Sequence, residues 1–233
     1  MEFLNRRQYY SFTDEVPPVE LIKEILGDTL LTTPIKNDMY GFKVKVFGPE
    51  YKKEKEEFLS YTACCSQNSS YKEEQEMYRR LMKEHYKSPS EELMRLAIER
   101  KEEADFTRGG KMLFNTQVLS PWLFRFELTD VYWRGNQKTV DMSSSGIGGY
   151  ERDDKKIIGL SMFAINLANI AKERGIDSSF TGCVHFPNYH TPILEGLSSD
   201  QVPFILNLGY GKHRRQTRPI IKKPTLSQVV NFA

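Results

Sequence analysis

The sequence predicts an α+β fold. Segments with strand and helix patterns alternate along the chain, but without the regular βαβ rhythm of a doubly wound sheet. The chain of 233 residues fits one large domain or two small ones and is long enough to bury a substantial core. With 39% hydrophobic and 27% charged residues, its composition is that of an ordinary globular protein.

The N-terminal part predicts a helix followed by a strand. Pro17 and Pro18 precede apolar residues at helical spacing, which indicates a helix that begins at the prolines and ends or loosens at Gly27 and Asp28. Residues 42–47 alternate apolar and polar side chains, as in a half-buried strand, and Gly48 and Pro49 stop this strand.

Residues 51–105 are highly charged and helical in pattern. The likeliest helices span residues 73–86 and 90–103, and the second has a capping signal at residues 88–92. The charge is most simply explained as a solvated helix face. We therefore expect this region to be an excursion outside the main core.

The C-terminal half predicts strands at residues 112–118 and 122–128, separated by Ser120 and Pro121. Residues 157–174 form the most apolar helix of the chain. Because apolar side chains surround it on most sides, we expect it to be buried and central, and Gly175 to cap it. Further strands are expected at residues 178–184 and 202–209, the latter leading into a basic tail.

Net charge and apolar runs exclude several classes of function. The net charge of +2 gives no general attraction to nucleic acid or membrane. No apolar run approaches the ~20 residues of a membrane span, and the N-terminus has no signal-peptide core, so we expect a cytoplasmic protein. The three cysteines, Cys64, Cys65 and Cys183, form no paired framework and are expected to be free thiols.

Two motifs suggest sites but lack the residues to complete them. The glycines at residues 146–149 do not have the full GxGxxG spacing, which favours a flexible connector over a phosphate loop. Cys183, His185 and His190 lack the further ligands that a metal ion needs, so no metal is expected. The sequence contains no HExxH or GxSxG motif, which removes support for zinc hydrolysis or a nucleophile elbow.

Two basic segments at opposite ends of the chain carry the clearest functional signal. Arg6 and Arg7 lie at the start, and residues 211–223 contain six lysines or arginines. Together they could converge on one anion, most commonly a phosphate, because arginine presents a bidentate fork to it. The alternatives are a nucleic-acid patch or plain solvated surface, and Pro219, Ile220 and Ile221 interrupt the charge.

In order along the chain, these pieces resemble the FMN-dependent nitroreductase family. Residues 5–17 look like the family's arginine-rich start, which the same short helix follows, and residues 33–37 look like its proline-to-asparagine loop before the first strand. The helix at 157–174 with residues 175–182 resembles the family's buried helix and glycine-containing turn. Residues 202–210 and 222–230 resemble its closing strand and its basic, proline-containing segment. The resemblance spans nearly the whole chain apart from residues 51–105.

The resemblance implies a fold and a chemistry. The fold would be one domain over residues 1–233, with a central, mainly antiparallel sheet flanked by helices, an excursion at about 51–105, and an intertwined homodimer. The protein would bind FMN, take hydride from NADH or NADPH and reduce a nitroaromatic, quinone or similar small acceptor in a ping-pong cycle. Since the flavin carries this chemistry, no catalytic residue is expected, which agrees with the absence of a catalytic dyad from the sequence.

The resemblance also implies which residues bind the cofactor. Arg6 and Arg7 would reach the flavin phosphate and ribityl chain, with Gln8 in place of the usual serine. Lys222, with Arg218, would close the phosphate site from the tail. The simpler alternative for Arg6 and Arg7 is a surface ion pair with nearby acidic residues.

At the other end of the flavin, Asn37 would hydrogen-bond the ring or ribityl hydroxyls; alternatively it caps a turn. Thr181 and Gly182 would approach the ring with backbone groups, because a small residue allows close contact.

Several positions depart from the family pattern. Tyr10 stands where a second basic residue is usual, and residues 38–42 depart from a Gln-Pro-Trp pattern. The same flavin cradle could therefore serve another reduction, such as dehalogenation, or flavin breakdown. A non-catalytic binding protein with a basic C-terminal tail is the alternative from a different class, whereas the nitroreductase resemblance implies neither a nucleic-acid nor a membrane partner.

Overall fold

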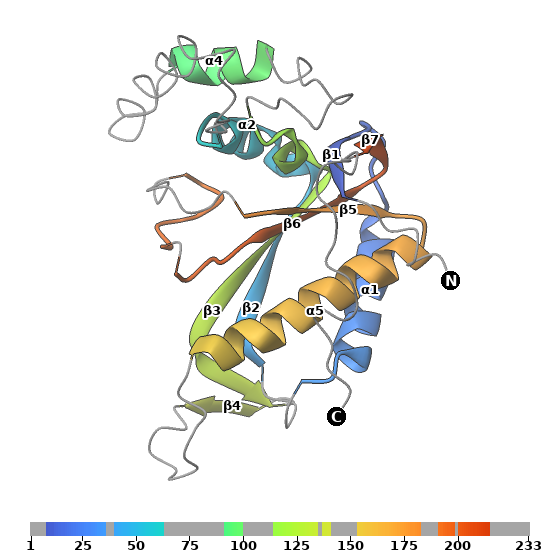
Figure 1. Ribbon diagram of the computed structural model, residues 1–233, viewed down its shortest axis with the longest axis vertical. Coiled ribbons are helices and arrows are strands. Elements are labelled where there is room, and N and C mark those ends of the chain that lie inside the picture. Colours follow the sequence, from blue (N-terminus) through green and yellow to red (C-terminus); the bar gives the residue numbers. More distant parts are fainter. Residues whose placement is uncertain are drawn as a thin grey trace, which may run out of the picture.

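The computed structural model describes residues 8–35, 40–62, 91–99, 114–134, 137–140, 153–182, 191–198 and 200–214. Helices lie on both sides of a twisted antiparallel sheet (Figure 1). The sheet has the strand order β2-β3-β6-β5, and β4 pairs with β3 beside this path. A separate two-stranded ribbon joins β1 to β7. The predicted α+β class and its mainly antiparallel sheet are confirmed.

The strands are β1 (Tyr9–Phe12), β2 (Tyr40–Phe47), β3 (Trp122–Arg134), β4 (Gln137–Val140), β5 (Asp177–Thr181), β6 (Ile205–Gly209) and β7 (Gly211–Arg214). The helices are α1 (Val19–Thr32), α2 (Lys52–Ser60), α4 (Glu91–Glu99) and α5 (Asp153–Glu173), with short 3-10 turns η3 (Pro49–Tyr51) and η5 (Thr116–Leu119).

Alternation along β2 and β3 separates two hydrophobic clusters. Val44 lies opposite Phe126 and Val46 opposite Phe124, and these side chains face α1 and α5. The residues between them point to the other side, where Phe47 and its neighbours pack with α2 and η5. Because side chains of a strand alternate with period two, a single pair of strands supplies both clusters.

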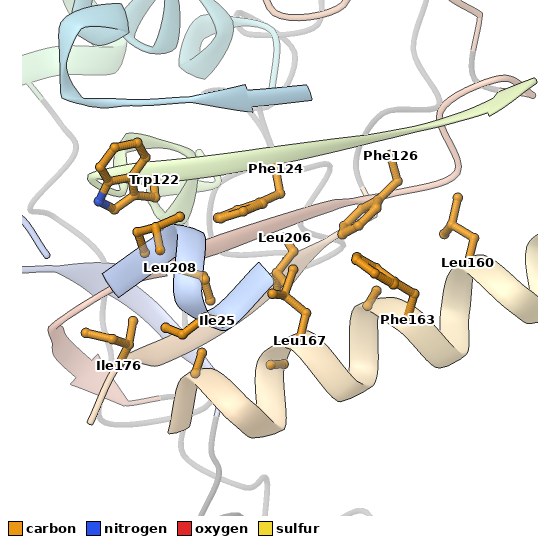
Figure 2. Close-up of a cluster of buried hydrophobic side chains, with 14 of the residues drawn as sticks. Ile25, Trp122, Phe124, Phe126, Leu160, Phe163, Leu167, Ile176, Leu206 and Leu208 are labelled. Atoms are coloured by element: carbon orange, nitrogen blue, oxygen red, sulfur yellow. The ribbon is translucent and has the colours of Figure 1, made fainter. Parts of the chain in front are cut away.

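The cluster under α5 is the larger one. Leu160, Phe163 and Leu167 of α5 point toward Phe124 and Phe126 of β3 and toward β6 (Figure 2). All five side chains are buried, and the Phe126 and Phe163 rings meet edge to face at 6.5 Å. The amphipathic packing of this helix against the sheet is the main apolar contact that holds the fold.

Helix α5 is buried on one face only. Ile158, Met162 and Ile165 are exposed on its other face, Ile158 to 59%. The expectation that this helix is buried on most sides is therefore wrong for the single chain. An apolar outer face remains available for a partner surface.

Helix α1 continues beyond the predicted end at Gly27 and Asp28 to Thr32. The buried stripe of Ile22 and Ile25 continues at Thr29, whose hydroxyl donates a hydrogen bond to the Ile25 carbonyl at 2.6 Å. The helix ends directly before Thr33, because the following Pro34 disfavours helical backbone at the residue before it. Continued burial outweighs the weak breaking tendency of one glycine.

Residues 114–119 do not form the predicted strand at 112–118. Phe114, Thr116, Gln117 and Val118 are all buried, and the backbone turns through the bonds Val118 N–H to Asn115 O and Ser120 N–H to Gln117 O. A run buried on every side lacks the two-residue alternation of a strand. Residues 112 and 113 lie outside the described ranges.

The other predicted strands that the structure describes are confirmed with shifted ends. The strands predicted at 42–47 and 122–128 are longer, as β2 and β3, whereas those at 178–184 and 202–209 are shorter, as β5 and β6. The helix predicted at 90–103 is described over α4 only, and the one at 73–86 lies outside the described residues. In the charged region, α2 buries Phe58 and Leu59 in the second cluster. In the part of the chain that is described, no helix is both long and apolar enough to cross a membrane.

Candidate functional site

The ribbon of β1 and β7 pairs a segment near the start of the chain with a segment near its end. The strands run antiparallel, with Tyr9 opposite Arg214 and Phe12 opposite Gly211, and the register shifts at Ser11. Figure 1 shows the ribbon beside one end of β5. Because the pairing is antiparallel, the chain that precedes Gln8 and the chain that follows Arg214 leave from the same end of the ribbon.

Gln8 links the ribbon to β5. It forms a parallel bridge with Ser178, and its side-chain Nε2 donates a hydrogen bond to the Phe180 carbonyl at 2.9 Å. On the neighbouring η5 turn, the Thr116 hydroxyl donates to the Tyr10 carbonyl at 2.7 Å. The ribbon is thus tied by polar contacts to the strand that carries Thr181.

The end of β5 is held from inside the protein. Asn207 of β6 is fully buried, and its Nδ2 donates to the Ser179 carbonyl at 3.1 Å and to the Thr181 hydroxyl oxygen at 2.9 Å. Gly182 follows directly and is exposed. Among the described residues, none has an atom within 4 Å of a Cβ added at Gly182.

The chain turns a tight corner where β6 passes into β7. Cβ atoms added at Gly209 would lie 2.8 Å from Pro121 and 3.0 Å from the Phe12 ring, and at Gly211 they would overlap the Tyr9 ring. Both positions therefore require glycine for the close approach of β1. The Asp177 carboxylate accepts the Gly211 N–H at 3.1 Å and pairs with Lys172 of α5 at 3.0 Å.

The structure brings together three of the predicted cofactor residues. Thr181 is the last residue of β5 and Gly182 follows it. Gln8 lies beside them, because its side chain donates to the carbonyl of Phe180, directly before Thr181. The other predicted cofactor residues lie outside the described ranges; they are Arg6, Arg7, Asn37, Arg218 and Lys222.

The residues of the two incomplete motifs, at 146–149 and at Cys183, His185 and His190, also lie outside the described ranges. Across the ranges that the structure covers, no three His, Cys, Asp or Glu residues group in a way that could hold a metal ion.

Two buried cations were not predicted from the sequence. Lys55 of α2 donates to the carbonyls of Gly48, Ser120 and Pro121 at 2.8, 2.9 and 2.8 Å. Burial lowers the pKa of the Lys55 ammonium to about 8, against the opposing attraction of Glu50 and Glu54. Lys55 lies in a run of alternating charges that resembles an exposed helix face, so no sequence signal marks it.

Arg125 of β3 is the second buried cation, with 2% of its side chain exposed. It pairs with Glu127 and with Glu195, the latter at 3.0 Å, and donates to the Ile193 carbonyl. Hydrogen bonds from Lys45 first, and then from Arg125, hold the pKa of Glu195 below its ordinary value. The alternation of Arg125 and Glu127 on one face of the strand is the signal that could have indicated this pair.

The fold matches solved structures across the whole chain. A FMN-dependent nitroreductase from Mycobacterium smegmatis in complex with NADPH aligns with a TM-score of 0.57 and 11% identity, covering 100% of this chain and 96% of that one. The fold is that of the nitroreductases. A nitroreductase with bound FMN from Desulfitobacterium hafniense aligns with a TM-score of 0.53 and 15% identity, over 100% and 98% of the two chains.

A nitroreductase-like family protein from Bacillus cereus has the same fold, with a TM-score of 0.55, 14% identity and coverage of 100% and 94%. No protein-family model and no curated protein matches the sequence. The predicted resemblance is thus confirmed in the nitroreductase fold, at an identity expected of a divergent chain.

Proposed function

We propose that this protein is an FMN-dependent oxidoreductase that takes hydride from NADH or NADPH and passes electrons to a small acceptor in a ping-pong cycle. The nitroreductase fold supports this function, and the pairing of β1 with β7 is the observation that carries it. That pairing sets Tyr9 opposite Arg214, and in this proposal the two basic segments, about 200 residues apart in sequence, continue from there to one bound phosphate.

The residues of the chain ends fit a phosphate. Arg7 and Arg6 directly precede Gln8 in the sequence. Arg218 follows Arg214 by four residues, and Lys222 follows four residues later. In this proposal Arg6, Arg7, Arg218 and Lys222 supply the cationic groups that hold the phosphate at this end of the ribbon.

The end of β5 suits the flavin ring. The described residues leave space beside the backbone of Gly182, and Asn207 fixes the Thr181 side chain that precedes it. We assign backbone contact with the ring to Thr181 and Gly182, and contact with the ring or ribityl hydroxyls to Asn37; Gln8 holds the neighbouring Phe180 carbonyl. When bound, FMN supplies the hydride chemistry, and the protein binds and orients it.

A homodimer belongs to the same proposal. The outer face of α5 exposes Ile157, Ile158, Met162 and Ile165, and α1 exposes Leu30 and Leu31. Helices α1 and α5 contact each other, so these side chains belong to one helix pair. An apolar face of this kind is more typical of a protein interface than of a monomer surface, and we propose that a second copy of the chain covers it.

An absorbance spectrum of the freshly purified protein tests the proposed function. We expect flavin bands, with a maximum at roughly 450 nm, that bleach when NADH or NADPH is added without oxygen and return when a nitroaromatic or quinone is added. Bleaching that only a halogenated acceptor reverses would indicate dehalogenation, and loss of the flavin itself would indicate flavin breakdown.

A colourless protein that takes up no added FMN would contradict the proposal. Nucleic-acid affinity that falls steeply with salt would then favour a binding protein with a basic tail. A yellow protein that neither nucleotide reduces would keep the FMN site and exclude the oxidoreductase.

A further inference from the structure

We propose that Asp177 is a positioning residue for the phosphate end of the cofactor, acting through the ribbon of β1 and β7. This inference rests on the proposed FMN function. The Asp177 carboxylate contacts the first residue of the C-terminal basic segment, Gly211, at the corner from which β7 leaves the sheet.

The carboxylate joins three elements. Oδ2 accepts the backbone N–H of Gly211, the first residue of β7, at 3.1 Å, and Oδ1 accepts Lys172 of the last turn of α5 at 3.0 Å. Asp177 itself is the first residue of β5 and lies opposite Gly209 in the sheet register. A single side chain therefore connects the start of β7 to both α5 and β5.

Burial makes this contact stronger than an ordinary surface ion pair. The side chains of Asp177 and Lys172 are only 15% and 18% exposed. In the bond to Gly211, the acceptor is the charged Asp177 carboxylate and the donor is a backbone N–H. The strand already fixes this N–H, so only the Asp177 side chain loses freedom when the bond forms. Exposed pairs such as Arg174 with Asp28, at 43% and 42%, contribute little by comparison.

The other side of the corner is closed by aromatic rings. The Tyr9 ring covers Gly211 and the Phe12 ring covers Gly209, and the Thr13 N–H donates to the Tyr210 carbonyl at 2.7 Å. These contacts join β1 to the same corner. Strand β1 is also tied to β5 by Gln8 and to η5 by Thr116, so Asp177 acts on the β7 side of the ribbon, which leads into the C-terminal basic segment.

The length of the ribbon turns a small change at the corner into a large one at its far end. Three steps from Gly211 to Arg214 span about 10 Å of extended chain. Gln8 holds the β1 side of that end to β5, so a change at the corner acts mainly on β7. A rotation of about 10° there would move Arg214 by roughly 2 Å, more than the whole range of hydrogen-bond lengths to a phosphate. In this proposal the phosphate contacts of Arg218 and Lys222 therefore depend on the corner being fixed.

Riboflavin separates this role from a general structural one, because it has the flavin ring and ribityl chain but no phosphate. We would measure the affinity of the apoprotein for FMN and for riboflavin, by flavin fluorescence, in the wild type and in Asp177→Ala and Asp177→Asn. Asp28→Ala is the matched control, because it removes another aspartate that is paired near the end of α5.

For Asp177→Ala we expect FMN affinity to fall about tenfold, because displaced cations lose part of their charged hydrogen bonds to the phosphate, and riboflavin affinity to change less than about twofold. Asp177→Asn keeps an oxygen that can accept the Gly211 N–H and should lose less. Asp28→Ala should leave both affinities unchanged. If Asp177→Ala does not fold, Asp177→Asn provides the same test. Its preference for FMN over riboflavin should be lower than that of the wild type.

Equal losses for the two ligands, or no loss of FMN affinity, would overturn the role of Asp177 while leaving the FMN function intact. A wild type that binds FMN no more tightly than riboflavin would also overturn it, because the phosphate would then not be recognised. A wild type that binds neither flavin would remove the proposed function, and the inference with it.

Discussion

Lys55 places an ammonium group inside the protein where three backbone carbonyls converge. These are Gly48 at the end of β2 and Ser120 and Pro121 before β3, so the side chain closes the end of this strand pair. We predict that Lys55→Met lowers the free energy of unfolding by about 3 kcal/mol, because three buried acceptors lose their donor. Urea denaturation measures the change, and Lys52→Met, at an exposed position of the same helix, should have little effect.

The pH dependence of stability gives a second test of Lys55. Its pKa is about 8 in the folded protein and 10.5 ordinarily, so between these values the unfolded chain holds more protons. Stability contributed by this group therefore rises with pH over that window, by up to about 3 kcal/mol. The difference in unfolding free energy between wild type and Lys55→Met should widen from pH 8 to pH 10. A constant difference would contradict the low pKa.

Single residues also show where sequence-based prediction stops. Gln8, Thr181 and Gly182 were selected by resemblance, and the structure groups them around the end of β5. Asp177 and Asn207 were not selected, because their partners lie on other elements. Asp177 accepts the N–H of Gly211. Asn207 donates to the Ser179 carbonyl and to the Thr181 hydroxyl. No spacing rule along the chain reveals such partners.

At the scale of elements, the two faces of α5 should respond differently to substitution. Ile165 is exposed to 45%, whereas Leu167 is fully buried under the sheet. We predict that Ile165→Glu converts the proposed dimer to a monomer with little change in monomer stability, because a charge in an apolar interface is left unpaired. Light scattering after gel filtration measures the mass, and a wild-type monomer would contradict the proposed interface.

Leu167→Ala is the matched substitution on the inner face. We predict a loss of 2–5 kcal/mol, roughly the cost of a buried leucine truncated to alanine, without a specific effect on association. The loss is measured by denaturant unfolding of the wild type and of Leu167→Ala, at a protein concentration where these two proteins have the same oligomeric state.

Helix α1 offers a stabilising substitution at Gly27. Glycine there lies inside the helix, and an added Cβ would have no atom within 4 Å. We predict that Gly27→Ala raises the free energy of unfolding by about 1 kcal/mol, the difference in helix propensity. Gly211→Ala is the contrasting change: its Cβ would overlap the Tyr9 ring, so it should lower stability and loosen β1. Thermal unfolding of both variants compares the two effects.

Elements with local patterns were predicted well, and those whose form depends on tertiary contacts were not. The alternation at residues 42–47 marks β2, and Gly175, with φ of 80°, ends α5 as predicted. The segment at 112–118 failed because burial on every side hides the turn of η5. Helix α1 continued past Gly27 because its buried face continues, which a local breaker signal does not show.

At the scale of the whole molecule, the contact between the two chain ends is the feature that local sequence cannot reveal. Tyr9 and Arg214 pair across nearly the full length of the chain. Only the order of weak motifs suggested this meeting, since each motif alone is compatible with solvated surface. The nitroreductase fold supplies the long-range arrangement, and the proposed phosphate site depends on it.

Arg6→Ala tests whether the meeting of the chain ends serves a ligand or only the fold. If the arginine holds the phosphate, its loss should weaken FMN retention about tenfold or more while changing the melting temperature of the apoprotein by little, because the ligand is its main partner. Lys222→Ala should act in the same way from the tail. In the double variant the two losses should be less than additive, because both cations serve one anion. FMN affinity is measured by fluorescence titration and apoprotein melting by calorimetry; equal losses of affinity and apoprotein stability would identify Arg6 as a structural arginine.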